Sequence, residues 1–295
     1  MATGINHDTF SEQPYITVAE YKNAPTAIDF DNLVVGGDAA AQDAELANVI
    51  LRASSYMDEF FNQNLCANTE TETQRTRLTP QGYLAIHPNN DPIIAVTNFQ
   101  YGTDPNNLQT LNDCSMIWFE EQQFIVPLAQ MATTYSSQGA LAFGFPSSTR
   151  TQTYVQYTYD AGYVNNLIAT AVGGQSSMTV QNPTGIAPGM KYRIYDAGKS
   201  ETIQISPSYV YGSTTVPLVS PLLYNHDNTV TFGNLPSAVK QACILLTTAF
   251  IKVRGDNSLT MNITTKPSSN QRGADQFGSE IALAMTMVDK YRRIR

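Results

Sequence analysis

The sequence has few charged residues and few cysteines. Charged residues make up 14% of the 295 residues, against about 25% in average globular domains, and Asn, Gln, Ser and Thr carry the polarity instead. The cysteines, Cys66, Cys114 and Cys243, are odd in number, lie far apart and form no Cys-x-x-Cys pair. That spacing argues against both a disulfide framework and a zinc site, and it predicts synthesis in a reducing compartment.

Long apolar runs and basic surfaces are also missing. No stretch approaches the roughly 18 apolar residues that a membrane-spanning helix needs, so no membrane partner is expected. The opening residues MATGINHDTF contain neither a basic segment nor an apolar run, which predicts that no signal peptide is present. The formal net charge of −8 disfavours generic nucleic-acid binding, because that binding requires a basic surface.

Signatures of catalysis are absent as well. The sequence holds no G-x-S-x-G, no P-loop and no G-x-G-x-x-G, which are the common motifs of hydrolases and nucleotide-binding proteins. None of the histidines, His226 included, has a second His or Cys at ligand spacing, so we expect no metal site. Asp196 and Glu201 flank a glycine turn, a pattern typical of an exposed hairpin rather than an acid–base pair, and residues 225–228 indicate a plain turn. The sequence therefore predicts no enzyme and no cofactor.

Helical periodicity is present in several segments. Apolar residues at i, i+3 and i+4 spacing predict one long helix over about 40–62 and another from Pro236 to Gly255, and a last helix is expected over about 278–291. Thr17 and Glu20 have the spacing of a capping box at the start of a short helix. We interpret the two long apolar faces as packing surfaces rather than cofactor sites.

Strand periodicity covers much of the remainder. Residues 69–156 alternate with period two between turn residues, which predicts hairpins, while 129–148 read as an irregular loop. Five short strands at spacings of about ten residues predict a small barrel or sandwich over 167–234, with a core that is marginal by itself. Sixteen Tyr and twelve Phe fit either an interface-rich protein or a β-rich globular one.

Two motifs, separated by about seventy residues, carry a resemblance to a known family. Residues 153–166 read TYVQYTYDAGYVNN and residues 235–255 read LPSAVKQACILLTTAFIKVRG. The chain resembles the head-to-tail connector (adaptor) proteins of tailed bacteriophages, in which a strand ending in Y-x-AGY leads within a few residues into a helix opening LP-x-AV-x-QA. The intervening segment, with V-x-x-x-TGI-x-PGM-x-Y-x-IYD over 180–196, looks like β-inserts of some large-genome siphophage adaptors. The stretch 75–157 is longer than in minimal adaptors.

The resemblance implies a fold class and a domain plan. The fold would be α+β, a helical bundle adaptor core with a strand-rich middle segment and an inserted small β-barrel or sandwich. The parts would be an N-terminal arm (1–14), the adaptor core (15–166 plus 235–255), the inserted β-domain (167–234), and a flexible linker with a C-terminal docking helix and basic tail (256–295).

The same resemblance implies a structural virion protein that forms a twelve-copy ring under the portal, in the neck between capsid vertex and tail. The protein would be made in the host bacterial cytoplasm. Its partners would be further copies of itself, the portal protein, a stopper or tail-completion protein, and DNA that passes through the lumen without sequence-specific binding. Subunit packing is expected at Leu46, Val49, Ile50, Met57, Phe60, Val239, Leu246 and Phe250. Portal docking is expected at Met285, Val288, Lys290, Tyr291, Arg292, Arg293, Ile294 and Arg295.

Two alternatives remain open at the level of sequence. One is a tail or baseplate structural protein whose β-insert binds a host glycan, which exposed clustered aromatic residues on the insert would favour. The other is an enzyme with a β-core, which the lack of any convergent titratable cluster disfavours.

Overall fold

The structure, a computed structural model, describes residues 13–26, 33–79, 82–120, 122–127, 152–254 and 272–292. The chain divides into two compact units, one made of Met1–Cys66 and Tyr163–Arg295 and the other of Ala67–Gly162. The expected N-terminal arm up to residue 12, the loop 129–148 and the linker over 256–271 lie outside the described residues.

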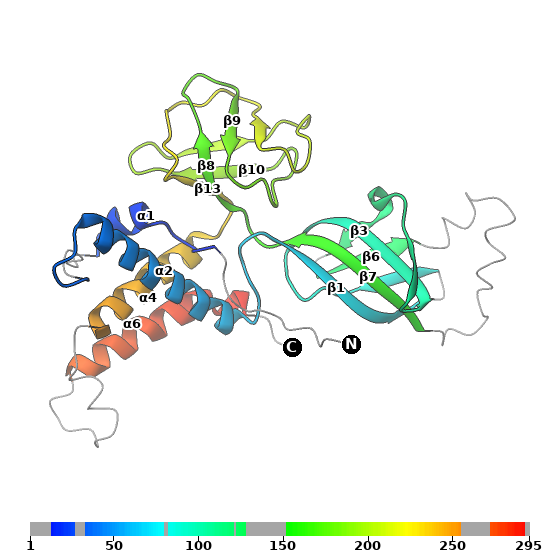
Figure 1. Ribbon diagram of the computed structural model, residues 1–295, viewed down its shortest axis with the longest axis horizontal. Coiled ribbons are helices and arrows are strands. Elements are labelled where there is room, and N and C mark those ends of the chain that lie inside the picture. Colours follow the sequence, from blue (N-terminus) through cyan, green and yellow to red (C-terminus); the bar gives the residue numbers. More distant parts are fainter. Residues whose placement is uncertain are drawn as a thin grey trace, which may run out of the picture. The chain divides into compact units, whose positions relative to one another are not determined.

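The first unit contains the helices (Figure 1). They are α1 (Val18–Lys22), α2 (Ala39–Phe61), α4 (Ser237–Arg254) and α6 (Arg272–Val288), which the short 3-10 helix η2 (Asp289–Tyr291) extends. The capping box predicted at α1 is confirmed, because the Glu20 backbone N–H donates to Thr17 Oγ1 (3.1 Å) and the Thr17 N–H donates to Glu20 Oε2 (2.9 Å). The last helix begins at Arg272, several residues before the expected start.

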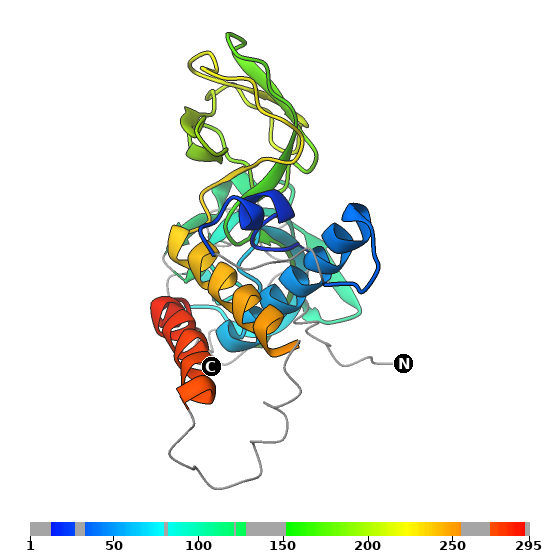
Figure 2. The ribbon, with the colours of Figure 1, turned by 90° about the vertical axis from the view of Figure 1, so that its left-hand side faces the viewer.

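The two long helices predicted from apolar spacing are confirmed, with α2 ending where Asn62 takes a left-handed conformation (φ 56°). Helix α4 lies between α2 and α6 (Figure 2). Their facing side chains form one core cluster, in which Ala284 and Val288 of α6 are fully buried. Each helix therefore buries its apolar face against its neighbours. Such packing supplies most of the stability of a helix in a folded protein.

The first unit also contains a six-stranded sheet. Its strands are β8 (Asn165–Thr170), β9 (Ser177–Val180), β10 (Lys191–Tyr195), β11 (Glu201–Gln204), β12 (Thr215–Pro217) and β13 (Thr231–Gly233), in the order β11-β10-β13-β8-β9-β12. The sheet curls (Figure 2), so that Ile205, just after β11, bridges to Leu218, just after β12. We call this part, residues 165–233, the insert.

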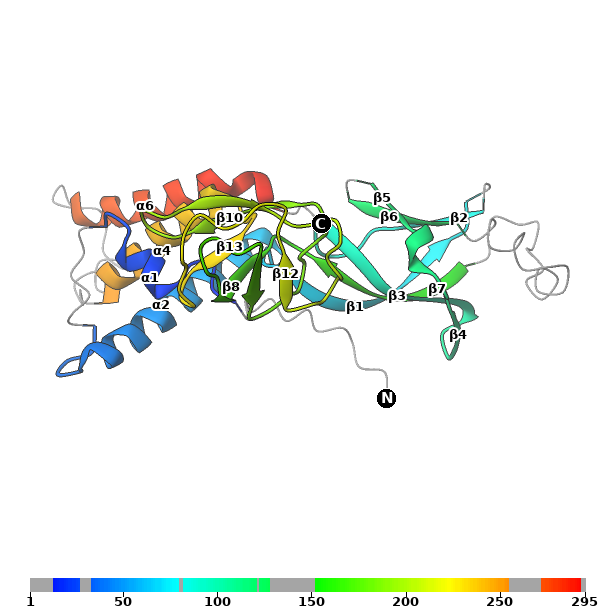
Figure 3. The ribbon, with the colours of Figure 1, turned by 90° about the horizontal axis from the view of Figure 1, so that it is seen from above.

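The second unit is built from two sheets. One has the order β1-β7-β3-β4, from β1 (Asn68–Arg77), β7 (Gln152–Ala161), β3 (Ile93–Asp104) and β4 (Asn107–Thr110). The other has the order β2-β6-β5, from β2 (Tyr83–Ile86), β6 (Gln123–Pro127) and β5 (Trp118–Glu120), and the 3-10 helix η1 (Cys114–Met116) precedes β5. Figure 3 shows the two sheets one above the other. Side chains of both, including Phe99, Phe124 and Tyr157, share one core.

The predicted helical-bundle core is wrong. The protein is mostly β-strand, with three sheets of which one is a curled half-barrel, and only 27% of it is helical. The prediction placed the two apolar helical faces in the main core and the strands in a middle segment and an insert. Strands β3 and β7, together with β2 and β6 of the facing sheet, instead build a separate core that is rich in aromatic residues. Alternating side chains of a strand point to opposite faces, so one face can be buried.

Candidate functional site

The two ends of the insert meet in space. The Val164 carbonyl accepts hydrogen bonds from the backbone N–H of Asn234 (3.0 Å) and of Leu235 (3.3 Å), and the Val164 N–H donates to Asn234 Oδ1 (2.8 Å). Val164, which directly follows the Y-x-AGY motif, and Leu235, which opens LPSAVKQA, are thus adjacent, although about seventy residues separate them in the sequence.

A glycine makes this junction possible. A Cβ atom placed on Gly233 would lie 1.8 Å from the Val164 carbonyl oxygen, a separation that no real contact allows. The backbones of β13 and of the chain entering β8 therefore approach more closely than any side chain at position 233 permits.

A buried ion pair joins the insert to the helices. Lys240 Nζ of α4 lies 2.7 Å from Glu20 Oε1 of α1 and 2.8 Å from Thr231 Oγ1 of β13. The ammonium also lies 4.0 Å from the centroid of the Tyr195 ring of β10, a cation–π distance. Burial lowers the pKa of Lys240 and the neighbouring Glu20 carboxylate opposes that effect. Two helices and two strands are held together at this point.

The insert contains a cluster that the sequence interpretation missed. His226 is not isolated: its fully buried ring places Nδ1 2.9 Å from Asp196 Oδ2 and Nε2 2.8 Å from Glu201 Oε1. Each nitrogen of the ring therefore lies within hydrogen-bonding distance of one carboxylate oxygen. The expectation that Glu201 is exposed on a hairpin is wrong, because it is buried. The glycine turn between Asp196 and Glu201 was visible in the sequence, but no spacing linked that hairpin to a histidine 25 to 30 residues away.

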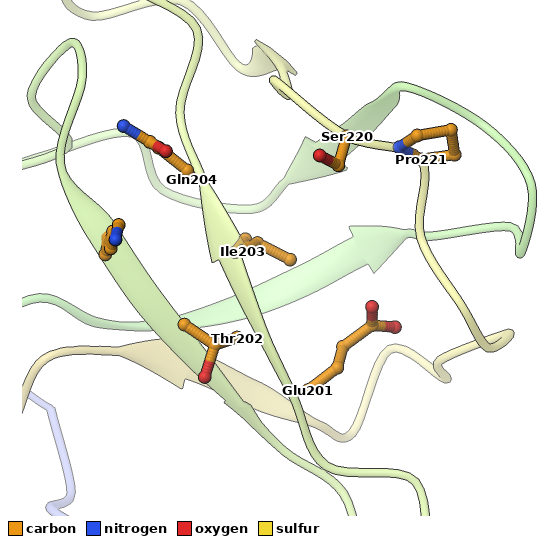
Figure 4. Close-up of a pocket in the computed structure, with 7 residues that line it drawn as sticks. Glu201, Thr202, Ile203, Gln204, Ser220 and Pro221 are labelled. Atoms are coloured by element: carbon orange, nitrogen blue, oxygen red, sulfur yellow. The ribbon is translucent and has the colours of Figure 1, made fainter.

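This cluster fixes the backbone of the loop formed by residues 219–224. The Glu201 carboxylate accepts hydrogen bonds from the backbone N–H of Leu223 (3.0 Å) and of Tyr224 (3.2 Å). Ser220 and Pro221 of this loop line a pocket of about 230 Å³ (Figure 4). Its lining residues are Lys191, Glu201, Thr202, Ile203, Gln204, Ser220 and Pro221. The pocket and the buried cluster thus share Glu201.

The side chains expected to pack between subunits lie inside the chain's own helical core. Six of them are at most 2% exposed: Leu46, Val49, Ile50, Met57, Val239 and Leu246. Phe60 and Phe250 lie at the border of the same cluster, where Phe250 makes an edge-to-face contact with Tyr56 at 6.0 Å between ring centroids. Intrachain packing uses these side chains, so contacts between copies would have to use other surfaces.

The residues expected to dock on the portal divide into covered and exposed ones. Val288 is fully buried and Met285 partly buried in the helical core. The Tyr291 ring makes edge contacts with Phe61 (6.5 Å) and Tyr163 (6.2 Å).

Lys290 and Arg292 are exposed, and the Arg292 guanidinium lies 5.3 Å from the centroid of the Phe60 ring. Arg293, Ile294 and Arg295 lie outside the described residues.

Among the residues that the structure describes, no group of three or more His, Cys, Asp or Glu side chains is arranged to hold a metal ion. No described helix is both long enough and apolar enough to cross a bilayer. Comparisons with protein-family models, with curated proteins and with solved structures find no match to this chain.

Proposed function

We propose that this chain is a structural virion protein that forms a ring under the portal, joins the DNA-filled head to the tail and continues the DNA channel. The observation that carries the proposal is the junction at Val164 and Asn234. It joins the residue that follows the first motif to the start of the second, as expected if the insert interrupts an adaptor-like strand-to-helix connection.

The charge of the chain suits a channel wall. With a formal net charge of −8, acidic surfaces around a lumen repel DNA, so that it slides rather than sticks. A ring of identical subunits closes through a head-to-tail contact between two different patches of each copy.

The end of the last helix could contact the portal. Val288 of α6 is buried in the core, and Lys290 and Arg292, which follow it closely, are exposed cations. Cations at the C-terminal end of a helix are also favoured by its dipole. An acidic surface on the portal would complement this end of the chain.

The first experiment is a mass-spectrometric count of this protein against the portal protein in full virions and in DNA-filled tailless heads. A one-to-one ratio in both particles is expected. Presence only on tails, or a ratio far from one, would reject the neck position. Absence from all particles would reject a virion role altogether.

The pocket on the insert supports a second candidate, a tail or baseplate protein whose insert binds a glycan. Thr202, Gln204 and Ser220 offer polar groups of the kind that bind sugar hydroxyls. None of the pocket's described lining residues is aromatic, so an aromatic platform for a sugar ring is missing from it. Binding of the chain to host cells, with the protein found only on tails, would favour this candidate.

A further inference from the structure

Loop 219–224 of the insert displays apolar side chains to solvent. Leu223 is 74% exposed, Val219 53% and Tyr224 44%. Val172, 47% exposed, belongs to the neighbouring turn, whose Gly174 N–H donates to the Leu222 carbonyl (2.7 Å). Leu223 and Tyr224 are consecutive residues. Neighbouring exposed apolar side chains mark interaction surfaces, whereas single ones need no explanation.

The backbone of this loop is hydrogen-bonded to the buried cluster of Asp196, Glu201 and His226. Glu201, itself bonded to His226, accepts the N–H groups of Leu223 and Tyr224. The loop is also hydrogen-bonded to the neighbouring turn. The Leu222 N–H donates to the Gln175 carbonyl (2.9 Å), and the Gly173 N–H donates to Asn225 Oδ1 (2.7 Å). A loop fixed in this way loses little conformational entropy when its side chains are buried against a partner.

The chemistry of the surface points to a protein partner. The large apolar residues exposed on this loop and on the neighbouring turn are Val172, Val219, Leu223 and Tyr224, of which one is aromatic. Sugar rings are bound mainly by stacking on aromatic side chains, so this aliphatic surface suits another protein better than a glycan.

The distribution of charge points to a second copy of this chain as that partner. The insert contains three basic residues, Lys191, Arg193 and Lys199, and three acidic ones, Asp196, Glu201 and Asp227. With histidine counted as neutral its formal charge is zero, so the whole net charge of −8 lies elsewhere in the chain. Copies brought together through their inserts avoid the like-charge repulsion that other surfaces of the chain would meet.

We propose that loop 219–224 is a contact surface between neighbouring copies of this chain, with Leu223 as its central apolar side chain. This inference deepens the proposed function, because it names a surface through which the ring would be built. The helical faces first expected to do so are buried within each copy.

The test is photo-crosslinking of the full chain with benzoylphenylalanine in place of Leu223, and in place of Val210 as the control. Val210 is an aliphatic residue of the same insert with a similar exposure, 73%. Both variants are irradiated as concentrated purified protein and in assembled particles. A covalent dimer of the chain formed from position 223, at least about tenfold above that from position 210, is expected in one preparation or both.

No such dimer in either preparation overturns the proposal, and so does a crosslink from position 223 only to a different protein or to a cell-surface glycan. A second variant, Leu223→Asp, is expected to weaken self-association by about tenfold or more, while Val210→Asp leaves it unchanged. Equal effects of the two substitutions also count against the proposal. The portal count is independent: a failed crosslink beside a one-to-one ratio rejects the loop contact alone, and a dimer beside a failed ratio rejects only the neck position.

Discussion

At the scale of single residues, Gly233 decides whether the insert can return to the helices. We expect Gly233→Ala to lower the free energy of unfolding by about 2 kcal/mol or more, because its Cβ would overlap the Val164 carbonyl oxygen and force the backbones apart. Gly198→Ala is the matched control. Gly198 has open space around it and a φ of +78°, so that substitution should cost only about 1 kcal/mol of backbone strain. Urea unfolding of both variants measures the difference, and equal losses would contradict the steric role of Gly233.

A second prediction at this scale concerns alkaline pH. Burial raises the pKa of Cys243 from about 9 to about 12. Between these values the unfolded thiol ionises while the folded one stays protonated, so its stabilising contribution is complete below pH 9 and is lost as the pH rises toward 12. Wild-type protein should therefore lose about 1.4 kcal/mol per pH unit more than Cys243→Ala across this range.

Urea unfolding at a series of pH values from 8 to 11 checks the alkaline prediction. The buried tyrosines are common to both proteins, so their titration cancels in the difference. Cys114→Ala serves as the control, because Cys114 is less buried than Cys243 and its removal should change the slope less. Parallel pH profiles for wild type and Cys243→Ala would refute the prediction.

At the scale of elements, the two ends of the insert are already joined by hydrogen bonds between Val164 and Asn234. Replacing residues 165–233 with a short glycine linker between Val164 and Asn234 should leave α2, α4 and α6 folded, because these two residues are already hydrogen-bonded to one another. The helical circular-dichroism signal per molecule should be retained and should be lost cooperatively on heating. Loss of the helical signal would show that the helices depend on the insert, for which the Lys240, Glu20 and Thr231 contacts would be the structural cause.

At the scale of the whole molecule, the exposed basic residues at the end of the chain can be separated from the helix that carries them. Deleting residues 256–295 would also remove Ala284 and Val288 from the core, so a loss of portal binding would be ambiguous. We expect the substitution of Lys290, Arg292, Arg293 and Arg295 by Gln to weaken binding to the portal by about tenfold or more, with a larger effect at low salt. Sedimentation with isolated portal rings measures this, with Lys199→Gln as the control, and unchanged binding would reject the docking role of the basic tail.

Local features of the fold were predictable from the sequence because local interactions create them. The Thr17 and Glu20 capping box needs residues only three apart, and the apolar faces of α2 and α4 follow from a repeat of 3.6 residues. The strand character of β1, β3 and β7 likewise follows from alternation along one segment. In each case the side chains that interact, or share one face, are near neighbours in the chain.

The relative amounts of helix and sheet were not predictable in the same way. The resemblance to adaptors placed a helical bundle at the centre, whereas three sheets dominate and the helices make up 27% of the protein. Two short motifs describe one strand-to-helix connection, and they carry no information on how much of the remaining chain pairs into sheets or which strand pairs with which.

The sequence by itself determined the two long helices with their apolar faces, the capping box of α1, and the strand-rich character of the remainder. Only the tertiary structure decided that His226 lies between Asp196 and Glu201, that Gly233 touches Val164, and that Lys240 joins Glu20 to Thr231. The physical reason is sequence separation. These contacts link residues 9 to 220 positions apart, and they form only after the curled sheet and the helices have brought distant segments within hydrogen-bonding range.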